Sequence, residues 1–471
     1  MRLRLILPLL VALSAVLAAC TPPMPNAAAA FTSHTSGQTI HGSRTIVVTA
    51  KLTGAQPDAL ISVTSDARDV TKVRTGDDLE LTVVLKDNAN TITVSVANPG
   101  QAVPGSATLN LEYPFLTFAP SQAAAVVIGQ PDFNATTEIA TNKEFGGPYL
   151  RPLVLNGVMY LPDYGGDRVM GYLQVPTTNG AAADFVIGKQ DFDDLDSTVG
   201  AATLSGPQTV ATDGQRLYIV DYSFNRISVF NTPPTTSGAA ADFAIGQPDL
   251  VSDGRGTTAT SLDNPESMTI AGGRLIVADS GNSRVLIWNE VPTGFGVPAD
   301  LVLGQSDFVS GMSNAGGAVA ANTMNYPTDV WSDGTRLVVA DASNNRVLIW
   351  NTFPTTNFEA ADIVLGQAGF DSDVAAVGAT GLDYPYSVES NGNQLFVADA
   401  DNNRVLVWNT FPTTTAQPAD AVLGQVDFDA FGSATSATGL DYPVGVYLDG
   451  NRLFVADHDN YRYVILEGAD N

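Results

Sequence analysis

Two short polar segments of this sequence carry side chains suited to binding a cation. One contains Asp399, Asp401 and Asn403, and the other contains Asp457 and Asp459. Carboxylate and amide oxygens are the ligands that Ca²⁺ prefers, so calcium is the candidate ion, although neither segment has the glycine-containing loop of an EF-hand. Oxygen-bearing side chains also stabilise tight turns without a metal. Both interpretations stay open, and the turn is favoured.

Each segment also contains an aspartate that is followed five residues later by an arginine. This pair occurs six times, at steps of 58 or 62 residues. The pairs are Asp163 and Arg168, Asp221 and Arg226, Asp279 and Arg284, Asp341 and Arg346, Asp399 and Arg404, and Asp457 and Arg462. An aspartate and an arginine that flank a turn can form a bidentate ion pair across it. Since a catalytic residue is needed once rather than six times, we interpret the pairs as structural.

The elements that would position these pairs are short strands. In the repeat of Asp399 the strand candidates are 385–390, 395–398, 404–408 and 420–425. Asn391-Gly392 separates the first two and predicts a two-residue hairpin turn with positive φ at both positions. The same place holds Asn156-Gly157, Asp213-Gly214, Gly272-Gly273, Asp333-Gly334 and Asp449-Gly450. Four antiparallel strands per repeat predict an all-β fold with a six-bladed β-propeller over residues 123–471.

The fourth-strand phrase is offset from the Asp and Arg pairs. It ends at Gln130, Gln190, Gln247, Gln305, Gln367 and Gln425. The first copy precedes every pair, and the repeat of Asp457 has none of its own. We therefore predict that residues 124–130 complete the blade of Asp457, so that strands from both ends close the ring and leave no unpaired edge.

The repeated phrase, strand-Asp-x-x-Asn-x-Arg-Val-strand, resembles the NHL-repeat family of propellers, although the units here are longer. The amidating lyases that share this fold use a three-histidine zinc site. The chain has three histidines, and only His458 lies in the repeats, so such a site is excluded. Gluconolactonase-like enzymes hold a divalent metal through Asp, Asn and Glu. A metal-dependent hydrolase or lyase is therefore the alternative function, with Glu266 and Glu389 as candidate carboxylates at the central channel.

The N-terminus resembles a bacterial lipoprotein signal. Arg2 and Arg4 precede the apolar run 5–17, and Leu17-Ala18-Ala19-Cys20 resembles a lipobox. The resemblance implies cleavage before Cys20, acylation of this single cysteine and anchoring in a membrane. Residues 1–20 would be the signal and 21–30 a linker. Thr21 after the cysteine is typical of sorting to the outer membrane or cell surface in a Gram-negative organism.

Residues 31–118 have the pattern of short strands rich in β-branched residues, without a helical period. The segment 88–94 resembles bacterial immunoglobulin-like modules. We therefore expect an Ig-like β-sandwich that serves as a spacer between the membrane and the propeller.

The formal charge of −27 argues against nucleic acid as a partner, because phosphates require Lys and Arg. The acidic loop segments 190–196, 370–373 and 427–429 should lie on one face of the propeller, together with the Asp-to-Arg turns. Loops on a rigid scaffold commonly carry binding sites. We expect a lipid-anchored cell-envelope binding or scaffold protein, rather than an enzyme, which binds a protein, glycan or small ligand on this acidic long-loop face.

Overall fold

The computed structural model describes residues 27–470 except 37, 40–44, 66, 68, 85–87, 100 and 114–115. The described residues form β-strands, loops and short 3-10 turns, and they divide into two compact units after Tyr113. The predicted signal, Cys20 and most of the linker lie outside the described residues. Within the described ranges no helix is long and apolar enough to span a membrane.

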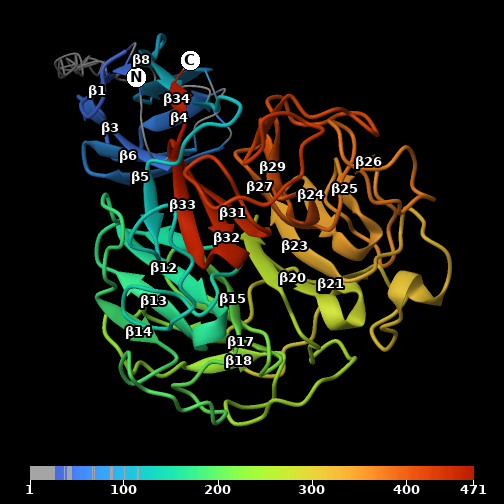
Figure 1. The fold of residues 1–471 in the computed structure, drawn as a ribbon. Helices are drawn as coiled ribbons and strands as arrows, with labels where there is room; N and C mark the ends of the chain where they lie inside the picture. The colour runs from blue at the N-terminus through green and yellow to red at the C-terminus, as the bar shows by residue number, and fades with distance from the viewer. Residues whose placement is uncertain are drawn as a thin grey trace, which may run out of the picture. The chain divides into compact units, whose positions relative to one another are not determined.

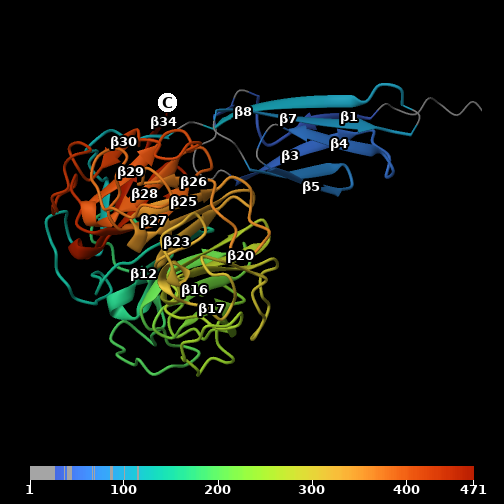
Figure 2. The ribbon, with the colours of Figure 1, turned by 90° about the vertical axis from the view of Figure 1, so that its right-hand side faces the viewer.

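The first unit is a two-layer β-sandwich (Figure 2). One sheet has the order β1 (Ala28–Phe31), β3 (Thr45–Thr53), β6 (Asp78–Val84) and β5 (Asp69–Thr75). The other has the order β2 (Gln38–Thr39), β8 (Gly105–Tyr113), β7 (Asn88–Ala97) and β4 (Leu60–Ser65). Val48 and Leu81 from the first sheet are fully buried in one core with Val94 and Leu111 from the second. Alternating apolar residues thus place one face of each sheet inside. The strand β1 begins inside the segment that was predicted to be linker.

The second unit contains six four-stranded antiparallel sheets (Figure 1). The first sheet is β11 (Leu153–Leu155), β12 (Val158–Asp163), β13 (Arg168–Tyr172) and β14 (Phe185–Ile187). The second is β15 (Pro207–Thr212), β16 (Leu217–Asp221), β17 (Arg226–Phe230) and β18 (Phe243–Ile245). The third is β19 (Ser267–Ala271), β20 (Arg274–Asp279), β21 (Arg284–Trp288) and β22 (Leu301–Leu303). The next two are β23 (Pro327–Ser332), β24 (Leu337–Asp341), β25 (Arg346–Trp350) and β26 (Ile363–Leu365); and β27 (Pro385–Ser390), β28 (Leu395–Asp399), β29 (Arg404–Trp408) and β30 (Ala421–Leu423). The sixth is β31 (Pro443–Asp449), β32 (Arg452–Asp457), β33 (Arg462–Glu467) and β10 (Val126–Ile128).

The first strands of successive sheets contact one another around a common centre. The sixth sheet also shares a buried core with the first, in which Phe454 and Ile465 pack with Met159 and Met170. The sheets therefore form the six blades of a closed β-propeller, as predicted.

The ring is closed by a strand that comes from before the first blade. Val126 pairs with Ile465 and Ile128 pairs with Tyr463, which confirms the prediction for residues 124–130. A second contact reinforces this closure, because β9 (Leu116–Thr117) pairs with β34 (Ala469–Asp470). Residues 116–118 therefore belong to the propeller unit rather than to the sandwich.

The first hairpin turn follows the prediction in two blades and departs from it in four. The turns Asn156-Gly157 and Gly272-Gly273 have positive φ at both positions and directly join paired strands. In the second, fourth and fifth blades the loop is two residues longer. There the first residue, such as Asp213, accepts backbone hydrogen bonds through its side chain, so an Asx turn replaces the expected conformation. In the sixth blade the turn is shifted to Gly450-Asn451.

Candidate functional site at the centre of the propeller

The six Asp and Arg pairs form buried ion pairs at the turns between the second and third strands. The distance from arginine Nε to aspartate Oδ2 is 2.7–2.9 Å in every blade, and these side chains are 0–2% exposed. Each aspartate ends the second strand, each arginine begins the third, and the two residues are cross-strand partners.

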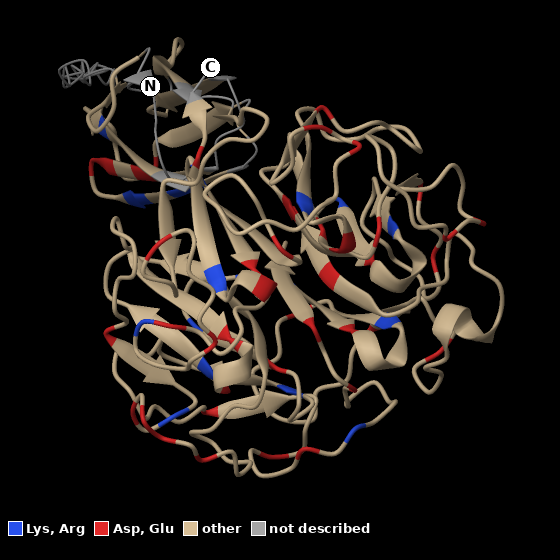
Figure 3. Ribbon diagram, in the orientation of Figure 1, with Lys and Arg blue, Asp and Glu red and all other residues tan. Residues whose placement is uncertain are grey.

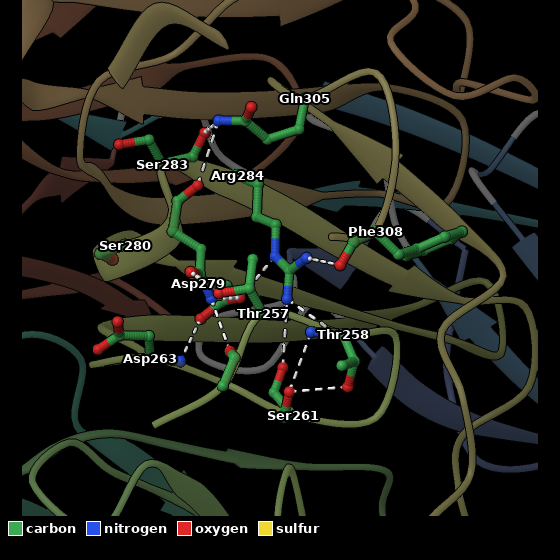
Figure 4. A network of polar contacts seen from close by, with 12 residues as sticks. Thr257, Thr258, Ser261, Asp263, Asp279, Ser280, Ser283, Arg284, Gln305 and Phe308 are labelled. Carbon is green, nitrogen blue, oxygen red and sulfur yellow. Dashed lines mark hydrogen bonds and ion pairs between the residues drawn. The ribbon is translucent and has the colours of Figure 1, made fainter. Parts of the chain in front are cut away.

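The predicted bidentate geometry is wrong. In the third blade only Nε of Arg284 bonds Asp279, whereas Nη1 donates to the carbonyl of Phe308 and Nη2 to those of Thr258 and Ser261 (Figure 4). The planar guanidinium thereby fixes two long loops as well as the turn. Burial raises the pKa of Asp279 to about 6, although Arg284 opposes the rise.

The candidate calcium ligands are occupied in other ways. Both carboxylate oxygens of Asp399 and Asp457 accept hydrogen bonds from the arginine, an asparagine and a backbone amide of their own blade. The side chain of Asn403 bonds backbone atoms at two points of the loop between β30 and β31, and Asp401 and Asp459 are exposed. Among the described residues no group of three or more His, Cys, Asp or Glu could hold a metal ion. The side-chain oxygens of Asp399, Asp457 and Asn403 thus stabilise turns and loops.

The fourth-strand phrase anchors the loop that follows it. In five blades the amide of its glutamine donates both to the carbonyl of the residue before the repeated arginine and to a carbonyl seven residues further along the loop. In the first blade the equivalent residue is Lys189, whose Nζ bonds the carbonyl of Asp196. The assignment of Gln190 to this position was therefore one residue out.

The acidic long loops use several of their carboxylates to cap their own backbone. Asp194 accepts hydrogen bonds from the amides of Gln190 and Asp196, and Asp196 accepts one from Thr198. These backbone bonds lower the pKa of Asp194 and Asp196. Acidic residues mark many loops of the propeller in Figure 3, and in the 190–196 loop these hydrogen bonds account for Asp194 and Asp196 without a ligand.

A cluster of tyrosines lies at the centre of the propeller, at the end where the Asp-to-Arg turns lie. Its ring contacts and hydroxyl hydrogen bonds form a closed chain with Glu266 and His458. We call the seven members the tyrosine ring: Tyr149, Tyr164, Tyr222, Tyr326, Tyr384, Tyr386 and Tyr442. Tyr386 is buried and the other six are partly exposed. Five blades contribute tyrosines and the third contributes Glu266, so every blade takes part.

Three of these tyrosines sit at unfavourable backbone positions. Tyr326, Tyr384 and Tyr442 precede the first proline of their strands with φ of 55°, 52° and 51°. This left-handed region suits Gly and Asn, and a bulky residue there is strained. The third and second blades have Asn264 and Gly206 at the same position. The backbone alone therefore does not explain the tyrosines.

The second blade shows how the aromatic positions exclude one another. A Cβ atom on Gly206 would lie 2.7 Å from the ring of Tyr164. Tyr164 and Tyr222 directly follow the repeated aspartates of the first and second blades. In each case the next blade has a small residue before its first proline, Gly206 next to Tyr164 and Asn264 next to Tyr222. Five members of the tyrosine ring thus come from two alternative sets of positions, and Tyr149 and Tyr386 come from a third, directly after the first proline of their blades.

Glu266 lies within the tyrosine ring and is 1% exposed. Its carboxyl accepts hydrogen bonds from the hydroxyls of Tyr326, at 2.7 Å, and Tyr386, at 3.2 Å. Burial raises the pKa of Glu266 to about 8 despite these bonds, and the charge of Asp329 adds to the rise. Burial raises the pKa of all seven tyrosines too, and the negative charge of Glu266 is a further cause in each.

A second polar layer joins the blades around Asp329, which is fully buried. Nη2 of Arg151 lies 3.1 Å from both carboxylate oxygens of Asp329, and Ser267 and Ser387 donate their hydroxyls to the same group. Arg151 also donates to two strand carbonyls. Since its oxygens are fully engaged, Asp329 acts as a structural junction of four blades.

Glu389 lies next to this junction, with Oε2 at 3.8 Å from Nε of Arg151. Burial raises the pKa of Glu389 to about 7, although the charge of Arg151 opposes the rise. Nε of Arg151 has no hydrogen-bond partner. The sequence had indicated Glu266 and Glu389 as candidates at the centre, and the structure places both there.

One further buried group near the centre lacks a partner. Gln208 is 1% exposed, and its Oε1 accepts no hydrogen bond. Gln208 follows the first proline of its blade, as Tyr149, Glu266 and Tyr386 do in theirs. Those three side chains meet at the centre, so the register directs Gln208 to the same place.

The closed ring of blades and its central site define a six-bladed β-propeller with a tyrosine-lined centre. No protein-family model matches the sequence, and no curated protein matches it. A structural-genomics protein of unknown function from Bacteroides thetaiotaomicron is 13% identical over 95% of this chain and 99% of its own, with a TM-score of 0.43. An aldose sugar dehydrogenase from Streptomyces coelicolor, in its PQQ-bound form, is 15% identical over 74% of this chain and 100% of its own, with a TM-score of 0.39.

A chain of a nidogen–laminin complex is 13% identical over 71% of this chain and 97% of its own, with a TM-score of 0.31. At these identities and TM-scores the similarity carries no argument about activity. The propeller fold rests on the strand pairing described above.

Proposed function

We propose that this chain is a lipid-anchored binding protein of the cell envelope. Acylated Cys20 holds it in a membrane, the outer membrane or cell surface in a Gram-negative organism. The sandwich, with an Ig-like arrangement, serves as a spacer. The NHL-like propeller binds a small ligand, or the exposed end of a protein or glycan chain, at the tyrosine ring.

The single observation that carries this proposal is the strained placement of Tyr326, Tyr384 and Tyr442. Positive φ at a bulky residue costs on the order of 1–3 kcal/mol, and Asn264 has that conformation at the same place in another blade. Sites that lower stability in this way are typically retained for function. Partly exposed aromatic rings around one point offer a large contact area at low conformational cost.

The residues before the first strand and those after the second strand lie at the same end of a blade. The tyrosine ring is therefore at the end that carries the Asp-to-Arg turns, which is the face on which the sequence led us to expect binding. The alternative, a metal-dependent hydrolase or lyase, required several non-repeated carboxylates to converge on the centre. Glu266, Asp329 and Glu389 do converge there. The oxygens of Asp329 are taken by Arg151 and two serines, so we favour binding.

The test combines a ligand screen with variants that relieve backbone strain. The purified mature chain would be screened against glycan and small-molecule collections by thermal shift and ligand-observed NMR. We expect Tyr442→Asn and Tyr384→Asn to fold with little change in melting temperature and to lose binding of the hits. Tyr461→Asn is the matched control, because Tyr461 also has positive φ, at 53°, and lies outside the tyrosine ring.

Hits that bind equally to all three variants would contradict a site at the tyrosine ring, and so would a complete absence of ligands. The anchoring part of the proposal is tested separately. Metabolic labelling with a palmitate analogue should mark the full chain in a bacterial host, and Cys20→Ser should abolish the label. Retention of the label in that variant would refute acylation at Cys20.

A further inference from the structure

The charged groups around the tyrosine ring are mainly acidic. Asp383 and Asp441 directly precede two of its members. The charges of further carboxylates act on members of the ring: Asp167, Asp263, Asp401 and Asp459. The charges of Asp401 and Asp459 act on Tyr442. Among the described residues, the basic groups here are His458, whose Nδ1 bonds the Pro148 carbonyl, and Arg255, which lies 3.5 Å from Asp263. The site thus presents negative charge and aromatic faces.

Glu266 is buried without a cation of its own. Its two oxygens accept tyrosine hydroxyls, and the nearest charged neighbour that affects it is another carboxylate, Asp329. The arginine of this layer, Arg151, is committed to Asp329 and to two strand carbonyls. An isolated charge in the interior is costly, so a buried carboxyl without a paired cation stays protonated until a cation arrives to neutralise its ionised form.

A second observation points to a missing hydrogen-bond donor. Buried polar atoms almost always have a partner, but Oε1 of Gln208 has none. Its strand β15 contacts β19, which Glu266 directly precedes, and the hydroxyl of Thr209 donates to the Glu266 carbonyl. The strand next to the one that Glu266 precedes therefore carries a buried acceptor that lacks a donor.

Aromatic faces arranged around a carboxylate are the usual means of recognising organic ammonium groups. From the tyrosine ring, Glu266 and Gln208, we infer that the ligand of this site carries an organic ammonium group, which the tyrosine faces surround and the carboxylate of Glu266 neutralises, and a nearby hydroxyl or N–H group that donates to Oε1 of Gln208. This inference rests on the proposed function and names the chemical class of its ligand.

Binding of such a cation is coupled to release of a proton. The groups that face Glu266 are the hydroxyls of Tyr326 and Tyr386, from the fourth and fifth blades, and Asp329, which is paired with Arg151. His458 lies at the edge of the tyrosine ring. Because burial holds the Glu266 pKa at about 8, the carboxyl is mostly protonated at pH 7 and mostly ionised at pH 9. A ligand that binds only the ionised form therefore gains about tenfold in affinity over this range.

The test compares choline with its uncharged isostere 3,3-dimethylbutan-1-ol by isothermal titration calorimetry on the mature chain. We expect choline to bind at least tenfold more tightly at pH 9 than the isostere does. Its affinity should rise about tenfold from pH 7 to pH 9. At pH 7 it should release close to one proton, measured in buffers of different ionisation enthalpy.

Glu266→Gln keeps a hydrogen-bond acceptor and removes the charge. It should abolish the pH dependence and the preference for choline without changing the far-UV circular dichroism. Glu389→Gln, which removes the other buried glutamate near the centre, is the control and should leave both unchanged. Tyr442→Asn, which removes an aromatic face, provides a second variant if Glu266→Gln does not fold.

Equal affinities for choline and the isostere, or pH-independent choline binding, would overturn the inference. If the ligand screen finds an uncharged ligand that depends on Tyr442 while choline does not bind, the inference fails and the proposed function stands. If no class of ligand binds at the tyrosine ring, both fail.

Discussion

Replacement of Glu266 by glutamine should change the pH dependence of stability in a predictable direction. The folded-state pKa of about 8 lies above the ordinary glutamate value of 4.5. The stabilising effect of the protonated carboxyl is therefore complete below pH 4.5 and is lost as the pH rises to 8. The rise from 4.5 to about 8 corresponds to about 5 kcal/mol in total, with about 3 kcal/mol lost by pH 7.

Glutamine stays uncharged at every pH, so the Glu266→Gln variant avoids this loss. We expect the two proteins to differ little below pH 4.5, and the variant to gain progressively on the wild type up to pH 8. For a domain of this size, about 3 kcal/mol corresponds to about 4 °C in melting temperature. All four tryptophans lie in the propeller, so tryptophan fluorescence during heating follows the relevant unit.

The control is Glu290→Gln, which removes an exposed carboxyl and should leave the pH profile unchanged. Parallel profiles of wild type and Glu266→Gln between pH 4 and 9 would refute the reasoning. They would mean that Glu266 titrates in the folded protein as it does in the unfolded chain. The tyrosine ring would then not shield its carboxyl from water.

Three further predictions concern the framework of the propeller. Arg346→Lys keeps the charge but loses the planar fork that bonds Asp341 and the loop carbonyls of Phe370, Ala320 and Thr323. In chemical denaturation it should cost about 3 kcal/mol, against less than about 1 kcal/mol for Arg255→Lys, at an exposed ion pair. A similar small effect of both would contradict the role of the fork. Val127→Asp places a charge in the closing strand at a fully buried position and should lower the melting temperature by several degrees, whereas Val426→Asp, at a position that is 75% exposed, should not. Thermal unfolding in EDTA and in a calcium or magnesium series should give the same melting temperature, because the oxygens of Asp399 and Asp457 are engaged; a saturable, ion-selective rise would show that a site was overlooked.

The repeated residues made the fold predictable from the sequence. A pair such as Asp399 and Arg404 has the same task in every blade, so its period indicated the number of blades. The offset between this pair and the fourth-strand phrase indicated how the ring closes. The geometry within the pair was not predictable in the same way. Whether a guanidinium fork faces a carboxylate or loop carbonyls depends on loops that fold back from more than twenty residues away.

The central site was less accessible to this reasoning, because it consists of residues that do not repeat. Glu266 and Glu389 stood out as acids in first strands, but Arg151 and Asp329 became significant only once three-dimensional packing brought them together. A usable signal was present at Tyr326, Tyr384 and Tyr442, each of which directly precedes a proline at the start of a first strand. A bulky residue at a turn that elsewhere holds Asn or Gly marks a position worth testing.

The closure of the ring also has a consequence for the order of folding. Ile128 pairs with Tyr463, so the strand that is synthesised first among the blades finds its partner only after all the others have been made. Long sequence separation between partners slows folding, and the exposed edge of β33 can pair with other chains in the meantime. A protease that removes residues 462–467 would leave β10 without a partner and open the ring. Resistance to aggregation should therefore depend on this one segment more than on any internal blade.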